Sequence, residues 1–105
     1  MEAQPREVLI CQTHDGREPF MEWLNGLDPK TRGIVFNRID RIESGNFGDT
    51  RSVGGGITEL RVDFGPGLRV YFGQKGNEVH LIDGGSKQTQ DKDIADAQDF
   101  WKTHA

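Results

Sequence analysis

The sequence predicts an α+β fold in which a short N-terminal strand precedes a helical hairpin packed on a twisted antiparallel β-sheet, with a helix at the C-terminus. Three observations support this class. Apolar residues recur with helical spacing between residues 15 and 44, the period changes to two from residue 57, and helical spacing returns after residue 89. No repeat, linker or shift in composition divides the 105 residues, so we expect one domain over residues 1–105.

The first half of the chain predicts one strand and two helices. Residues 7–12 form a short β-branched and apolar run, typical of a strand. Asp15 and Glu18 resemble a capping box, and the apolar stripe that follows consists of Phe20, Trp23, Leu24 and Leu27. Asp28-Pro29 ends this helix and begins a second one, which continues to residue 44. The short connection implies an antiparallel helical hairpin.

The second half predicts three strands and a final helix. We expect residues 48–56 to form a glycine-rich loop, and residues 57–64 and 68–74 to form alternating strands joined by the turn Gly65-Pro66-Gly67. With only these three residues in the loop, Val62 pairs with Val70 and Arg61 pairs with Tyr71. A second turn at 75–77 leads to a third strand, and Thr89 caps the last helix.

The polar face of this sheet holds the main candidate site. Same-parity positions on adjacent strands share a face, so the pattern groups four side chains there: Arg61, Arg69, Tyr71 and His80. Guanidinium groups bind phosphate oxygens bidentately and an aromatic ring can stack on a base, so this face suits an RNA phosphate ester. The alternative is a solvated sheet face on which the arginines pair with Glu59 and Asp63, and spacing alone does not separate the two.

Further polar residues extend this candidate site. Lys87 follows Gly84-Gly85-Ser86 at the exit of the last strand, where an anion could meet it near the start of the final helix. The other candidates for RNA contact are Arg51, Lys75, Gln90 and Lys92. Each of these residue types is also ordinary in a turn, a flexible loop or a solvated surface.

Charge and composition restrict the class of protein. The chain has 13 Lys and Arg against 17 Asp and Glu, a net charge of −4, which argues against a generic nucleic-acid binder. Residues 29–87 nevertheless hold nine basic and seven acidic groups. No apolar run is long enough to span a membrane and the first residues do not resemble an export signal, so we expect a cytoplasmic protein without membrane partners.

The cysteine and histidine content predicts neither a metal nor a cofactor. Cys11 is the only cysteine, which excludes an internal disulfide and a zinc cluster built from cysteines. His14, His80 and His104 are scattered along the chain without a helical i, i+4 pair. We therefore expect Cys11 to be a buried structural thiol and the histidines to bind no ion.

Four segments in order resemble a known family, the HigB-like "addiction module killer protein" group of the RelE/ParE toxin superfamily, which is often phage-derived. They are Phe20-x-x-Trp23-Leu24-x-x-Leu27, Gly45-Asn46-Phe47-Gly48-Asp49, Glu59-Leu60-Arg61-x-x-x-Gly65-Pro66-Gly67-x-Arg69-Val70-Tyr71-Phe72, and Gly84-Gly85-Ser86-Lys87-x-x-Gln90-x-x-Asp93-Ile94-x-x-Ala97. The resemblance implies a RelE-like fold, a toxin of a type II toxin-antitoxin system, and a small helix-turn-helix antitoxin of the HigA kind as partner.

The resemblance also implies two alternative activities. Toxins of the RelE branch cleave mRNA on the ribosome without a metal, whereas those of the ParE branch bind and poison DNA gyrase. The matching cations are Arg61, Arg69 and Lys87, with Arg51 a looser match, and paired arginines beside an aromatic ring favour RNA cleavage. Tyr71, His80 or Lys87 would then carry protons, and the sequence does not choose among them. Asp91, Lys92 and Asp93 stand where RelE has a catalytic tyrosine.

Overall fold

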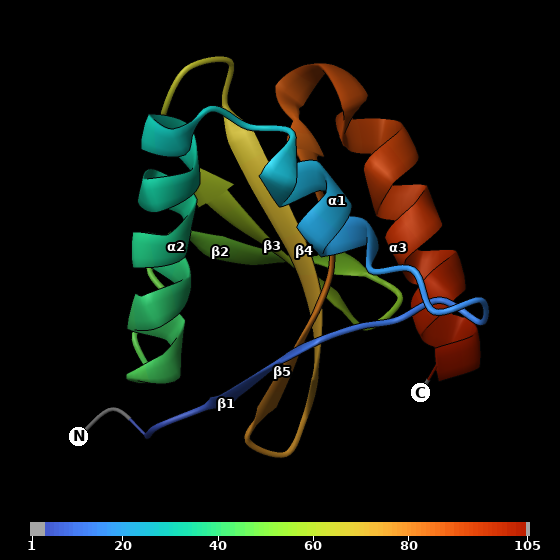
Figure 1. Ribbon diagram of the computed structural model, residues 1–105. Helices are drawn as coiled ribbons and strands as arrows, with labels where there is room; N and C mark the ends of the chain where they lie inside the picture. The colour runs from blue at the N-terminus through green and yellow to red at the C-terminus, as the bar shows by residue number, and fades with distance from the viewer. Residues whose placement is uncertain (1–3, 105) are drawn as a thin grey trace.

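The computed structural model describes residues 4–104, which contain five strands and three α-helices (Figure 1). In chain order the elements are β1 (Glu7–Ile10), α1 (Pro19–Asn25), α2 (Pro29–Glu43), β2 (Thr50–Gly54), β3 (Ile57–Val62), β4 (Leu68–Lys75), β5 (Glu78–Ser86), a 3-10 turn (Lys87–Thr89) and α3 (Gln90–His104). The predicted α+β, RelE-like architecture is confirmed.

The strands form one sheet in the order β1-β5-β4-β3-β2. The β3–β4 and β4–β5 pairs are antiparallel, as predicted. The β2–β3 pair is antiparallel as well, and β1 runs parallel to β5 at one edge. The sequence predicts this N-terminal strand but not its pairing. Chain order alone determines neither which edge of the sheet the first strand joins nor the direction in which it runs.

Strand β2 lies where the sequence predicts only a glycine-rich loop. The turn is confined to the end of this segment, because Gly54, Gly55 and Gly56 have φ values of 91°, 64° and 80°. The preceding residues are extended and pair with β3, Arg51 opposite Glu59. Three adjacent glycines make the whole segment resemble a loop and so hide this edge strand.

The β3–β4 register differs from the predicted one by two positions. Leu60 pairs with Val70 and Arg61 pairs with Arg69, not with Tyr71. The connection is longer than three residues, since β3 ends at Val62 and β4 begins at Leu68. A shift of two positions keeps every side chain on its predicted face.

Of the three predicted helix N-caps, only the one at Asp28 is confirmed. Helix α2 begins as expected: Pro29 is its first residue and the Asp28 carboxylate accepts a 3.2 Å hydrogen bond from the Thr31 amide. The capping box at Asp15 and Glu18 is wrong, because α1 begins at Pro19 and Glu18 makes no side-chain cap. The Thr89 cap is also wrong, because Thr89 forms a capping box with Ser86 around the 3-10 turn, ahead of α3.

Helices cover both faces of the sheet (Figure 1). Helices α1 and α2 pack on the face of Leu60, Val70 and Phe72. Helix α3 packs on the other face through Ala97 and Trp101. The second face is thus not the open polar surface that the sequence predicts, and α3 leaves only part of it accessible. Within residues 4–104, no helix is both long and apolar enough to cross a membrane.

Candidate functional site

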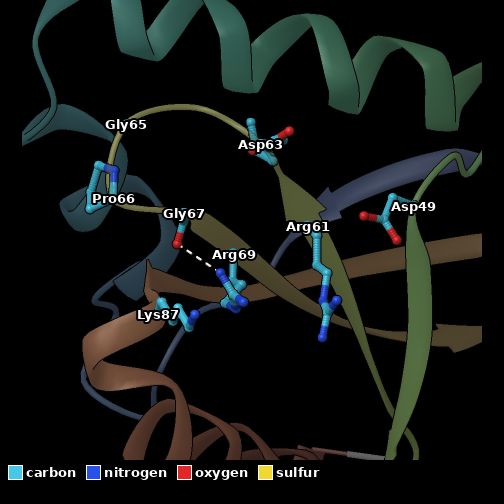
Figure 2. Close-up of a pocket in the computed structure, with 9 residues that line it drawn as sticks. Asp49, Arg61, Asp63, Gly65, Pro66, Gly67, Arg69 and Lys87 are labelled. Carbon is cyan, nitrogen blue, oxygen red and sulfur yellow. Dashed lines mark hydrogen bonds between the residues drawn. The ribbon is translucent and has the colours of Figure 1, made fainter.

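A basic cavity lies at the end of the β3–β4 hairpin, on the face that α3 covers (Figure 2). Arg61 and Arg69 are direct cross-strand partners, and both line this cavity together with Lys87. Figure 2 shows Arg69 between Lys87 and Arg61, with all three directed into the same space. The cavity has a volume of about 430 Å³, and its remaining lining residues are Asp49, Val62, Asp63, Gly65, Pro66 and Gly67. Its charged groups are thus three cations and two carboxylates.

Gly67 connects the turn of the hairpin to the start of the 3-10 turn. Its carbonyl oxygen accepts a 2.8 Å hydrogen bond from Nη1 of Arg69 and a 2.9 Å bond from the backbone amide of Lys87. Its φ of 78° lies in the region that favours glycine, and an added Cβ would lie 3.0 Å from Arg69 Nη1. Gly67 therefore holds the guanidinium group of Arg69 and the backbone of Lys87.

Glu59 is the residue of this site that sequence reasoning missed as a functional group. Its side chain is fully buried, and its carboxylate accepts bonds from Arg51 at 3.1 Å, Arg61 at 3.3 Å and Gln90 at 2.9 Å. Arg69 Nε lies 3.9 Å from the same carboxylate. Burial alone would raise the pKa of Glu59, but the hydrogen bonds from Gln90, Arg51 and Arg61 outweigh it and hold the pKa below its usual range.

The sequence feature that could have identified Glu59 is its position in the apolar–polar alternation of this strand. It directly precedes Leu60 and shares a face with Arg61. One of the two alternatives predicted from the sequence places Glu59 on a solvated sheet face as a surface partner of the arginines. In the structure its side chain is buried beneath them. The side chains of Arg51 and Arg61 are 52% and 39% exposed, and that of Arg69 is 10% exposed. Arg61 can thus contact a ligand directly, while the side chain of Arg69 is mostly buried where it lines the cavity.

The predicted grouping of four residues on this face holds only in part. Tyr71 lies beside the arginines, opposite Glu59, but its side chain is fully buried and does not line the cavity. Its hydroxyl has no hydrogen-bond partner among residues 4–104. Burial, followed by the charges of Glu59 and Asp93, raises the pKa of Tyr71. A protonated and enclosed phenol cannot reach a substrate in this cavity.

The remaining RNA-contact candidates divide between the site and other surfaces. Arg51 and Gln90 join the site through Glu59. Lys92 lies outside it, 80% exposed and paired with Asp96 at 2.7 Å. Lys75 lies at the far end of β4, with its Nζ 5.4 Å from the centre of the Trp101 ring.

His80 belongs to a separate cluster below the C-terminal end of α3. Its ring lies 5.4 Å from that of His104, and its Nε2 is 3.0 Å from a carboxylate oxygen of Glu78. Cys11 Sγ lies 3.9 Å from Nε2 of His104. Burial raises the pKa of Cys11 to about 11 against an opposing effect of Lys75, and burial, then Lys75 and His80, lowers that of His104. The histidines that look scattered in the sequence are therefore partly grouped, with the cysteine among them.

The comparison with protein families identifies the class. Residues 22–102 match the model of the phage-derived Gp49-like proteins (DUF891). The chain therefore belongs to this family, which is that of the HigB-like addiction module killer proteins, and the resemblance seen in the sequence is confirmed. The family is associated with toxin-antitoxin modules, which implies an antitoxin partner.

A curated relative supports this assignment. An uncharacterised protein of Haemophilus influenzae is 48% identical over 81 residues, which cover 75% of this chain and 82% of the relative. No solved structure matches the chain.

Proposed function

We propose that this chain is the toxin of a type II toxin-antitoxin pair, held inactive by a HigA-like helix-turn-helix antitoxin, and that it cleaves mRNA on the ribosome. The observation that supports this most is the cavity in which Arg61, Arg69 and Lys87 converge. Three cations around a small open cavity suit a single phosphodiester of an extended strand. The two carboxylates at its edge leave a modest positive excess, compatible with the acidic chain as a whole.

The proposed reaction begins with attack of a ribose 2′-hydroxyl on the adjacent phosphate. The 2′-hydroxyl gives up its proton to solvent water as the bond from the 2′-oxygen to phosphorus forms. The bond to the 5′-oxygen breaks, and negative charge accumulates on the nonbridging oxygens. Arg61 and Arg69 stabilise that charge, and one preorganised donor of this kind is typically worth about 3 kcal/mol of barrier. Glu59 holds both guanidinium groups in place before the substrate arrives.

Lys87 is the best-placed of the three proton carriers suggested by the sequence. It lines the cavity, whereas Tyr71 is enclosed and His80 lies in the other cluster. Its ammonium can donate a proton to the departing 5′-oxygen. The Gly67 carbonyl fixes the backbone of Lys87 and so limits where this group can reach.

The decisive experiment expresses the chain under inducible control in a bacterial host and follows growth, mRNA ends and plasmid supercoiling. We expect growth arrest with new mRNA ends that require translation, and Arg61→Ala or Lys87→Ala restores growth while the purified variants remain folded. Arg41→Ala, on the exposed side of α2, is the matched control and retains toxicity. Altered plasmid topology with intact mRNA would instead identify gyrase as the target, and equal toxicity of the cavity variants would contradict the phosphate-binding role.

A further inference from the structure

The fold brings together three side chains with metal-binding donor atoms, far from the basic cavity. Cys11 directly follows β1, His80 lies in β5, and His104 ends α3. One donor atom from each residue lies within 4.8 Å of those of the other two. Cys11 Sγ and His104 Nε2 are 3.9 Å apart.

Regular backbone structure determines the position of two of these residues. Strand β1 pairs in parallel with β5, Leu9 opposite His80, and the Cys11 amide donates a 3.0 Å hydrogen bond to the Leu81 carbonyl. Cys11 and His80 are both buried. His104 approaches them from the exposed last turn of α3, so it is the member of the cluster that can move most easily.

A thiolate and two imidazoles are the donor types that Zn²⁺ prefers. In a tetrahedral zinc site the metal–ligand distances place neighbouring donor atoms about 3.5 Å apart. One donor pair is 3.9 Å apart and none is more than 4.8 Å apart, so the donors must close by up to about 1.3 Å. A change of rotamer at the exposed His104 can supply most of that movement.

The surroundings of His80 resemble those of a metal-bound histidine. Nε2 of His80 lies 3.0 Å from a carboxylate oxygen of Glu78, which leaves Nδ1 as the nitrogen that would take the metal. Ligating imidazoles commonly have a carboxylate on the ring nitrogen opposite the metal, because that bond fixes the orientation of the ring. Glu78 is placed to act in this way.

We propose that Cys11, His80 and His104 bind one Zn²⁺ ion, with water as the fourth ligand. Solvent reaches the cluster from the side of His104, which lines a cavity of about 510 Å³ together with Gln12, Thr13, His14, Phe100 and Thr103. On binding, the thiol of Cys11 releases its proton to solvent and the thiolate takes the metal. The ion joins β1, β5 and the last turn of α3, so binding stabilises the packing of α3 on the sheet.

The test uses the purified, reduced full chain after treatment with a chelator. Zn²⁺ is titrated against a chromophoric competitor, Co²⁺ is added to detect thiolate-to-metal charge transfer, and thermal unfolding is followed with and without Zn²⁺. We expect one ion per chain, a thiolate band with Co²⁺, and a rise in Tm that increases with Zn²⁺ concentration. An absence of stoichiometric binding by the wild-type chain would overturn the proposal.

Variants distinguish this site from adventitious binding. His104→Ala, at an exposed position, is expected to weaken Zn²⁺ binding about a hundredfold or more and to abolish the Tm shift. Glu78→Gln weakens binding about tenfold, because it loosens His80. His14→Ala is the matched control: it removes a histidine from the same cavity but not from the cluster, and leaves affinity unchanged. Wild-type Zn²⁺ affinity in His104→Ala, or an equal loss of Zn²⁺ affinity in His14→Ala, would contradict the assignment. Both variants test it independently of Cys11→Ser, which changes a buried residue and could fail to fold.

Discussion

Arg61 and Arg69 are directly opposite each other in the β3–β4 ladder, and the buried carboxylate of Glu59 lies within 3.9 Å of both guanidinium groups. Like charges in direct opposition destabilise a sheet unless a counter-charge separates them. Glu59 provides that counter-charge, and Gln90 holds its second oxygen from α3. The helix therefore contributes to the geometry of the cations as well as to the core.

Replacing Glu59 with glutamine should destabilise the fold by about 2 to 3 kcal/mol. Arg51 and Arg61 are partly exposed and can regain water, but Arg69 is mostly buried and would lose its only counter-charge within residues 4–104. Urea unfolding of the wild-type chain and Glu59→Gln measures the difference. Glu43→Gln, at the exposed end of α2, is the control and should unfold with the wild type. A variant as stable as wild type would show that the carboxylate does not hold the cluster together.

The pH dependence of the same carboxylate provides a second prediction. The folded pKa of Glu59 lies below the unfolded value of about 4.3, so its contribution is complete above that pH and is lost as the pH falls through the folded pKa. The free energy of unfolding of wild type and Glu59→Gln should therefore converge as the pH falls below about 4. Urea titrations at several pH values between 7 and 3 measure this, and a constant difference would contradict it.

Close helix–sheet packing makes Gly84 intolerant of any side chain. A Cβ at this position would lie 2.2 Å from Cε3 of Trp23, where the buried Gly84 of β5 contacts the half-buried indole on α1. Gly84→Ala should cost about 1 to 3 kcal/mol of stability, because either the strand or the indole must move. Gly33→Ala on α2 is the matched control, since nothing lies within 4 Å of its added Cβ, and it should stabilise the helix by up to about 1 kcal/mol. Thermal unfolding of both variants should give Tm shifts of opposite sign.

Periodicity predicted most of the fold because the relevant interactions are local. The α2 cap at Asp28 and the strands after residue 56 depend on neighbouring residues and alternation, and the structure confirms both. The register of β3 and β4 depends on the length of the turn between them. The pattern predicts only Gly65-Pro66-Gly67 as this turn, whereas β3 ends at Val62 and β4 begins at Leu68. The parallel edge pairing of β1 depends on contacts between distant segments, so no local pattern could reveal it.

The same limit applies to the site. Alternation placed Arg61 and Arg69 on one face, and the structure adds Lys87 to the same cavity. Alternation could not show that α3 covers the rest of that face. This helix encloses Tyr71 and separates it from the cavity. Burial of a charged residue such as Glu59 also escapes a pattern analysis, because it depends on partners from three other strands and helices.

Substitutions of Tyr71 distinguish a residue of the buried core from a residue that contacts the substrate. Its buried hydroxyl lacks a hydrogen-bond partner among residues 4–104, so removing that oxygen relieves an unsatisfied polar group. Tyr71→Phe should therefore raise the free energy of unfolding by about 1 kcal/mol, as measured by urea denaturation, and leave growth arrest and mRNA cleavage unchanged. Tyr71→Ala is the contrasting variant, because it opens a large cavity in the core and should cost about 3 to 5 kcal/mol. A folded Tyr71→Phe variant that loses toxicity would show that the hydroxyl reaches the substrate, which requires α3 to move away from this face.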